Sequence, residues 1–347
     1  QYNFGLDFSV LDDRISGTID FYDKKTKDLL QNIPIPTSSG YSNILINKGD
    51  ISNKGVELLM NFDVVSNDDF EFSFGGNIAF NRTNLESLGV PADDFYINGV
   101  AEQRSFFFGN NISRGQIFQS PANVFVEGEE TSLFYGFETD GIYQNDDTDL
   151  VDGAVPGDVR IIDQNGDGII DDLDRTFIGN PNPDFVYGLN LNLRYKRLSL
   201  SMLFNGVYGN DIANGNLLTI GNATGQFQNV LSDSYYNAWR PDAPSNVHPR
   251  IGYNTVGDTA ITDRIIEDGS FLRLNNLTIG FDFPVENSKL FDRFNLFVMA
   301  QNLFTWTDYS GYNPEISSFS YDGLRNGVDW NGSPDAKNLS IGVNINF

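Results

Sequence analysis

The feature that most constrains this chain is a set of long segments in which apolar and polar residues alternate. Residues 338–347 show the alternation most clearly, and residues 2–10 repeat it. Two paired stretches, 56–80 and 185–208, carry the same pattern on both sides of a short polar turn. Successive side chains of a strand point to opposite faces, so each segment predicts a strand with one apolar and one polar face.

The length of these segments distinguishes membrane strands from ordinary ones. Several run for ten or more residues, whereas strands of globular proteins usually stop at about five or six. A tilted strand needs roughly 9 to 11 residues to cross a bilayer. With weaker candidates included, the chain offers about eleven strands of the kind found in outer-membrane barrels. The weaker candidates are residues 115–126, 131–145, 269–283 and 293–306.

The connections between the predicted strands alternate in length. Tight turns follow residues 11, 65 and 196. Long connections are expected at residues 26–53, 83–113, 146–183, 209–268 and 307–336. Short turns on one rim and long loops on the other are typical of outer-membrane barrels. The predicted fold is therefore all-β, a transmembrane antiparallel β-barrel with short periplasmic turns and long extracellular loops.

A soluble β-sandwich or β-solenoid is the alternative fold, because alternation arises there too. The polar face consists largely of Gly, Asn and Ser, which suits a water-filled or plugged lumen better than the apolar core of a sandwich. Aromatic residues at the strand ends are expected to form an interfacial girdle. They are Tyr22, Tyr195, Tyr208 and Trp306.

Composition excludes several classes of protein. The net charge of -25 argues against nucleic acid as a partner, because binding a phosphate backbone calls for clustered Lys and Arg. No apolar run approaches the roughly 18 residues of a membrane helix. The chain begins inside a predicted strand, without an initiator Met or a signal peptide. An odd number of antiparallel strands cannot close a barrel, so we expect a longer protein in which residues 1–347 form the C-terminal portion.

The sharpest local motif begins at Asp163 and follows the spacing of a calcium-binding loop. Gly168 permits the sharp turn of such a loop, and Asp174 stands where an EF-hand prefers Glu. We predict a calcium site outside a true EF-hand, because Pro156 and Gly157 precede it. The alternative is an acidic turn that binds nothing. The predicted ligands are Asp163, Asn165, Asp167, Ile169 (through its carbonyl), Asp171 and Asp174.

Nothing in the sequence indicates catalysis. The chain has no cysteine and a single histidine, His248, in a polar stretch, so thiol and Ser-His chemistry lack their residues. Neighbouring carboxylates such as Asp93 and Asp94 are expected by chance among 47 acidic residues, and glycosidase work is not assigned to them. We therefore predict that the chain is not an enzyme.

The longest predicted loop carries an aromatic and basic cluster at Tyr235, Tyr236, Trp239 and Arg240. On an outward loop these side chains would stack on sugar rings or anchor a protein partner. The alternative, equally weighted, is that they pack the loop on itself.

Taken together, the motifs resemble those of SusC/RagA-like TonB-dependent outer-membrane transporters. The resemblance covers nearly the whole chain and rests on a series of short segments in the family's order. They are Asn53-Lys-Gly-Val-Glu57, Tyr135-Gly-Phe137, Gly141-Ile-Tyr143, Pro156-Gly-Asp-Val-Arg160, the loop from Asp163, Asp174-Arg175, Ile178-Gly-Asn-Pro-Asn-Pro183, Phe271-Leu-Arg-Leu-Asn-Asn-Leu277 and Ala300-Gln-Asn-Leu-Phe304. Phe347 matches the C-terminal aromatic residue of outer-membrane barrels.

The resemblance implies a barrel of about 22 strands, of which this chain would supply about eleven. It also implies an N-terminal plug domain and a TonB box, both outside this chain, and a SusD-like surface lipoprotein as partner. Such transporters import glycans or oligopeptides across the outer membrane of Bacteroidetes-type Gram-negative bacteria, and are expected as pairs of transporter-lipoprotein units in contact with outer-membrane lipid. The alternative function is a membrane anchor or docking partner without import.

Overall fold

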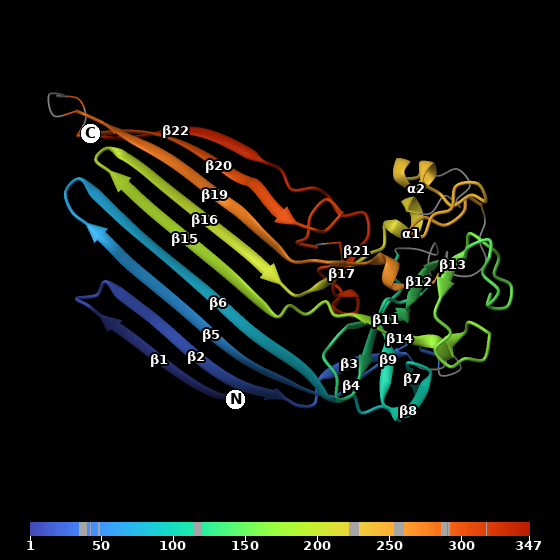
Figure 1. The fold of residues 1–347 in the computed structure, drawn as a ribbon. Coiled ribbons are helices and arrows are strands. Elements are labelled where there is room, and N and C mark those ends of the chain that lie inside the picture. Colours follow the sequence, from blue (N-terminus) through green and yellow to red (C-terminus); the bar gives the residue numbers. More distant parts are fainter. Residues whose placement is uncertain are drawn as a thin grey trace.

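One large antiparallel sheet dominates the molecule (Figure 1). The computed structural model describes residues 1–347 except 35–39, 42, 48, 114–119, 222–228, 253–259, 286–289, 291 and 317. Within this part of the chain the sheet has nine strands, which confirms the all-β prediction. In sheet order they are β1 (Tyr2–Val10), β2 (Ile15–Thr26), β5 (Asp50–Ser66), β6 (Phe70–Ser87), β15 (Phe185–Tyr195), β16 (Leu198–Tyr208), β19 (Phe271–Phe283), β20 (Arg293–Thr307) and β22 (Asn338–Asn346).

The register of the strands produces the two faces that the sequence predicts. Leu6 lies opposite Ile19, which lies opposite Leu58, and the row continues to Ile78 on β6. Because side chains alternate along a strand, the Asn, Ser and Gly residues align on the other face. Many apolar side chains, such as that of Leu6, remain exposed. An apolar face of this extent is what a strand presents to lipid.

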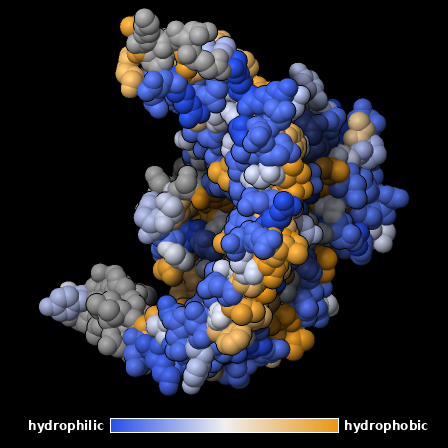
Figure 2. Space-filling view, turned by 90° about the vertical axis from the view of Figure 1, so that its left-hand side faces the viewer, coloured by the Kyte–Doolittle hydropathy of each residue, from blue (hydrophilic) through white to orange (hydrophobic). Residues whose placement is uncertain are grey.

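The connections alternate between the two ends of the sheet, as predicted. The short ones lie at the end that carries the C-terminus, and the long ones gather at the opposite end (Figure 1). Seen from the end with the short turns, the molecule is hollowed on one side (Figure 2). The short connections are residues 11–14, 67–69, 196–197 and 284–292; the long ones are residues 27–49, 88–184, 209–270 and 308–337.

The large sheet is open. Its edges are β1 and β22, and with nine antiparallel strands these two run in the same direction. Antiparallel pairing between them is therefore excluded, and the barrel is not closed within this chain.

The prediction of about eleven barrel strands exceeds the nine that are described, because residues 120–126 and 131–145 are not barrel strands. Residues 115–119, the first part of one predicted strand, lie outside the described residues. Among the described residues the two stretches contribute β10 and β11 to a separate four-stranded sheet. All four residues of β10 are buried, so the stretch is a core segment too short to cross a membrane. Residues 88–184 are consequently one long connection. The four strands are β9 (Phe106–Phe108), β10 (Asn123–Val126), β11 (Leu133–Phe137) and β14 (Arg175–Gly179).

Smaller elements complete the long connections. Among them are the strand pairs β3 (Leu30–Pro34) with β4 (Asn43–Asn47), β7 (Asp93–Ile97) with β8 (Val100–Arg104) and β12 (Thr139–Ile142) with β13 (Val159–Ile161), and the sheet of β17 (Asp211–Asn214), β18 (Ile266–Asp268) and β21 (Val328–Asp329). The described residues also form the helices α1 (Leu217–Ile220) and α2 (Ser232–Tyr236) and the 3-10 turns η2 (Asp172–Asp174), η3 (Asp263–Ile265) and η4 (Gly323–Arg325).

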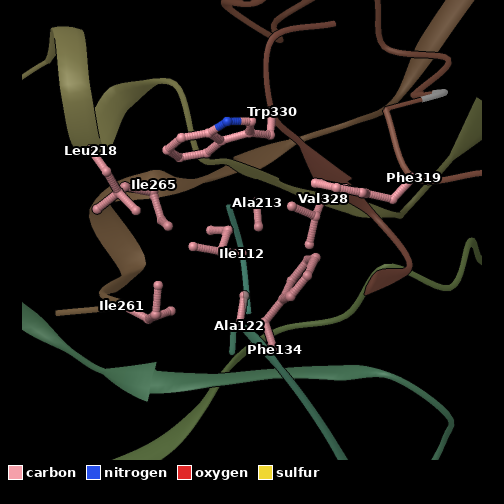
Figure 3. Packing of buried hydrophobic residues seen from close by; sticks show 10 residues of the cluster. All are labelled: Ile112, Ala122, Phe134, Ala213, Leu218, Ile261, Ile265, Phe319, Val328 and Trp330. Atoms are coloured by element: carbon pink, nitrogen blue, oxygen red, sulfur yellow. The ribbon is translucent and has the colours of Figure 1, made fainter. Parts of the chain in front are cut away.

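The long connections share a hydrophobic core of their own (Figure 3). Phe134 comes from the connection of residues 88–184, Ile265 from that of residues 209–270, and Trp330 from that of residues 308–337. Because three connections contribute to one core, the loop end is a packed unit rather than a set of separate loops. In the described part of the chain, helices are too short and too polar to form a membrane span.

Candidate functional site

The loop end and the adjoining polar face of the sheet are the candidate site, because the chain's polar side chains and long connections meet there. Arg273 joins the two. It belongs to β19, lies on the polar face opposite Thr305, and its side chain is only 4% exposed. A buried guanidinium needs acceptors for its N–H groups, and the connection of residues 308–337 supplies most of them.

The contacts of Arg273 involve all three of its nitrogen atoms. Nε donates to Thr305 Oγ1 (3.0 Å), and Nη2 donates to Asn313 Oδ1 (2.6 Å). Nη1 donates to Asp335 Oδ2 (2.8 Å) and to Glu315. The side chain therefore fixes the connection of residues 308–337 to the inner surface of the sheet. No role for Arg273 was predicted from the sequence, although it stands between the apolar residues Leu272 and Leu274, a position that places it on the polar face.

The predicted calcium loop lies in the connection between β13 and β14, at the loop end of the molecule (Figure 1). Asp163 accepts hydrogen bonds from the backbone N–H groups of Gly166 and Gly168, both at 2.7 Å. Asp174 is fully buried, and its two oxygens accept from Gln164 N and Asp171 N, both at 2.9 Å. The backbone thus wraps around Asp163 and Asp174 much as a cation-binding loop wraps around its ion.

The remaining predicted ligands also turn toward the backbone. Asn165 Oδ1 accepts from Asp167 N, Asp167 Oδ1 accepts from Ile169 N, and Asp171 Oδ1 accepts from Leu173 N. In the described residues no three Asp, Glu, His or Cys side chains are placed to hold a metal ion together. The donor set has the oxygen chemistry of a calcium site, but no three of its carboxylates lie together. Calcium binding stays a prediction that requires these side chains to rotate.

The two central carboxyls of this loop differ in their electrostatics. Burial raises the pKa of Asp174 above its ordinary value, and the negative charge of Asp163 adds to the increase. Burial also acts to raise the pKa of Asp163, but the N–H groups of Gly168, Gly166 and Asp167 outweigh it, so that this pKa is lowered. Asp163 is therefore the carboxylate whose charge the loop stabilises.

The predicted aromatic cluster is split by the structure. Trp239 is buried against Phe137 and Val159, and its Nε1 donates to Gln144 Oε1 (3.1 Å). Tyr235 and Tyr236 are instead exposed in α2, with their rings perpendicular at 5.4 Å. Trp239 thus packs its connection against that of residues 88–184, and the two tyrosines are left as surface groups.

Arg240 and His248 lie close to that cluster. Arg240 Nη2 donates to Tyr235 O (3.4 Å), and its backbone pairs with Ala243 in a tight turn. His248 Nε2 lies 3.0 Å from Asp233 Oδ2 in the same segment. These contacts give both residues a structural place in the connection of residues 209–270.

A second buried ion pair was missed by the sequence analysis. Asp158 is fully buried, and its Oδ1 accepts from Arg250 Nε at 2.6 Å. The pair joins the connection of residues 88–184 to that of residues 209–270. Asp158 belongs to the motif Pro156–Arg160, which the sequence did show. In the structure, Gly157 beside it has a φ of +93° and lies against Trp239.

Comparison with known proteins agrees with this architecture. Residues 1–114 match the family model described as TonB dependent receptor-like, beta-barrel. Over the whole chain, the sequence is 32% identical to TonB-dependent receptor P3 of Formosa agariphila, and 28% identical to TonB-dependent receptor SusC of Bacteroides thetaiotaomicron. The chain spans about a third of the length of these relatives: 34% of the receptor P3 and 31% of SusC.

A solved structure shows the same fold. The chain of the RagAB peptide transporter superposes on 99% of this chain with a TM-score of 0.77 at 24% identity, and 35% of that chain is covered. The nine-stranded sheet with its two faces thus has the fold of an antiparallel β-barrel segment. It is SusC/RagA-like, as the motifs indicated, and matches the C-terminal part of TonB-dependent receptors.

Proposed function

We propose that this chain is part of a TonB-dependent importer of the outer membrane, acting with a SusD-like surface lipoprotein on a glycan or an oligopeptide. The observation that carries the proposal is the match of the full chain to receptors of this type, together with the polar inner face of the sheet. Both the receptor P3 and SusC are named as receptors, which supports a role other than catalysis.

The geometry supports a specific division of roles. The apolar face would contact lipid, and the polar face would line the lumen. The packed loop end would form the mouth, where Tyr235 and Tyr236 are exposed on α2 and available to a substrate or a lipoprotein. Energy would come from TonB acting on a plug domain in the longer protein.

The alternative is a barrel that anchors or docks a surface complex without import. The buried core of the loop end (Figure 3) suits docking as well as transport, because it offers a fixed platform. The two functions differ in whether the cell loses uptake of a nutrient when the protein is absent.

The test uses the cells that make the full-length protein. Its gene is deleted, and growth on a panel of glycans and on a peptide mixture is compared with that of a strain complemented with the full-length gene. The expected result is loss of growth on one nutrient class, which complementation restores in a strain with TonB but does not restore in a TonB-deficient strain. Normal growth of the deletion strain on every nutrient would favour docking, provided that a lipoprotein co-purifies in mild detergent with the full-length protein from the complemented strain.

A further inference from the structure

A pocket lies where the polar face of the sheet meets the loop end. Its volume is about 420 Å³, and small-molecule sites in proteins usually measure about 300–1,000 Å³. Thr83 of β6 lines the pocket, and its Oγ1 donates to Oδ1 of Asn53 on the polar face (2.6 Å). The other side chains that carry the argument are those of Thr131, Phe319, Asp322 and Arg325.

Arg325 holds hydrogen-bond donors that no described residue accepts. Its side chain is mostly buried, and its guanidinium carbon lies 4.3 Å from the centre of the Phe319 ring. Nε is 2.9 Å from Asp322 Oδ2, so the two charges are paired. Even so, neither Nε nor Nη1 has an acceptor in hydrogen-bonding geometry within the described part of the chain. Because unused buried donors are costly, an occupant that brings acceptor oxygens would be stabilised here.

Asp322 leaves the pocket without net charge. Its carboxylate accepts from Asn110 Nδ2 (3.0 Å) and from Leu324 N (3.1 Å), in addition to its ion pair with Arg325. Asp322 and Arg325 are the two charged residues among those that line the pocket. The pocket therefore offers donors and hydroxyl groups but no free charge, which suits an uncharged ligand rich in oxygen atoms.

The polar face beside the pocket also lacks unpaired charge from β6 to β22. Near the short turns Glu71 pairs with Arg194, and Asp282 pairs with Arg293. Arg273, near the loop end, has the acidic partners described above. Between these ends the face carries uncharged groups, among them the amides of Asn77, Asn190, Asn192, Asn205, Asn276 and Gln301.

We propose that this pocket binds one sugar unit of an uncharged glycan, whose hydroxyl oxygens accept from Arg325 and bond with Thr131. The inference rests on the importer proposed above and narrows its substrate to neutral glycans. Sugar hydroxyls both donate and accept hydrogen bonds, as do the amide groups of the adjoining face. The charged ends of a peptide or the carboxylates of an acidic glycan would instead lose hydration without gaining a free ion partner.

The first experiment compares nutrients, using the deletion strain and the strain complemented with the full-length gene. The neutral glycans are amylopectin, β-mannan and inulin; the acidic ones are polygalacturonate and alginate; a peptide mixture is the third class. Growth of the deletion strain is expected to fail on a neutral glycan and to stay normal on the acidic glycans and on peptides.

The second experiment tests the pocket by calorimetry. Full-length protein in mild detergent is titrated with a hexasaccharide of the neutral glycan that the deletion strain cannot use. Arg325→Lys keeps the charge beside Asp322 but loses the guanidinium donors, so binding should weaken about tenfold. Thr131→Val keeps the shape and removes a hydroxyl, and should weaken binding about fivefold. Thr148→Val makes the same change at an exposed residue that does not line the pocket, and should bind as the wild type does.

The outcomes separate this inference from the importer itself. Normal growth on every nutrient would remove the importer and this inference with it. A growth defect confined to an acidic glycan or to peptides would leave import standing and overturn the inference. Equal affinities of T131V and T148V for the hexasaccharide would exclude the pocket as the sugar site. The nutrient comparison needs no pocket variant, so it decides the substrate class even if R325K fails to assemble.

Discussion

Replacing Arg273 is expected to release the connection of residues 308–337 from the sheet without unfolding the barrel. Arg273→Ala removes a buried guanidinium that contacts Thr305, Asn313, Glu315 and Asp335. Truncating one partner of a buried ion pair costs about 3–5 kcal/mol. Water can replace part of the lost contact here, because the Glu315 and Asp335 side chains are 45% and 43% exposed.

The lower end of that range, about 3 kcal/mol, is therefore the expected cost. Since each 1.4 kcal/mol is a factor of ten, the opening constant of this connection should rise roughly a hundredfold. Amide hydrogen exchange of the full-length protein in detergent measures the change directly, as a loss of protection confined to residues 308–337 and to the β19 positions beside Arg273. Arg273→Lys should be intermediate, because an ammonium keeps the charge but not the planar set of donors.

Arg194→Gln is the matched control. Arg194 lies on the same face of the sheet but near the short turns, where it pairs with Glu71, and both side chains are partly exposed. An exposed pair contributes about 0–1 kcal/mol, so exchange in residues 308–337 should not change. Unchanged protection in R273A, or an equal loss in R194Q, would refute the assignment of Arg273 as the anchor.

Three other perturbations test the loop end. Asp163→Asn should weaken the loop of residues 163–174 by about 1–2 kcal/mol at pH 7, through loss of charged acceptors. Because the folded state lowers the pKa of Asp163 below 3.8, this stabilisation is present above about pH 4 and is lost as the pH falls through the lowered pKa. The difference in amide-exchange protection of the loop between wild type and variant should therefore shrink on acidification. A difference that persists at low pH would contradict the reasoning. Trp239→Ala should open the connection of residues 209–270 to proteases at a cost of about 3–5 kcal/mol, whereas Tyr236→Ala should change stability by no more than about 0.5 kcal/mol; equal sensitivity of the two variants would argue against Trp239 as a packing residue. We also propose that the loop takes up calcium: transfer from chelator to about 1 mM calcium should raise its exchange protection, and Asp167→Ala should abolish the gain. No gain in the wild type would show that backbone N–H groups alone hold the loop.

The large sheet was predictable because each strand carries its own signal. Alternation in residues 338–347 and 185–208 sets which face is apolar, and a shift of one residue in register would turn the apolar side chains to the other face. The tight turns are marked as well, because polar residues interrupt the alternation there. In the structure, Asp12, Asp13 and Lys196 adopt positive φ at these turns. Local pattern and long-range pairing agree along these strands, which is why the sequence sufficed.

The loop end was not predictable in the same way. Residues 115–126 and 131–145 are apolar enough to suggest strands, but only the packing of β10 and β11 shows that these stretches serve a core outside the barrel. Trp239 and Arg273 illustrate the limit: the sequence shows an aromatic group and a cation, while their partners Gln144 and Asp335 lie 95 and 62 residues away. No periodicity connects positions so distant in the chain.

These contacts also restrict how the mouth of the barrel can move. The connections of residues 88–184, 209–270 and 308–337 share one core, and Trp330 of the last contributes to it. Asp158 and Arg250 bind the first two connections together, while Arg273 holds the third to the sheet. Displacing one connection alone would expose core side chains and leave a buried charge without its partner, at a cost of several kcal/mol. These three connections should therefore act as a fixed wall, and the importer proposed above would have to open by moving other parts, such as a plug or a lipoprotein.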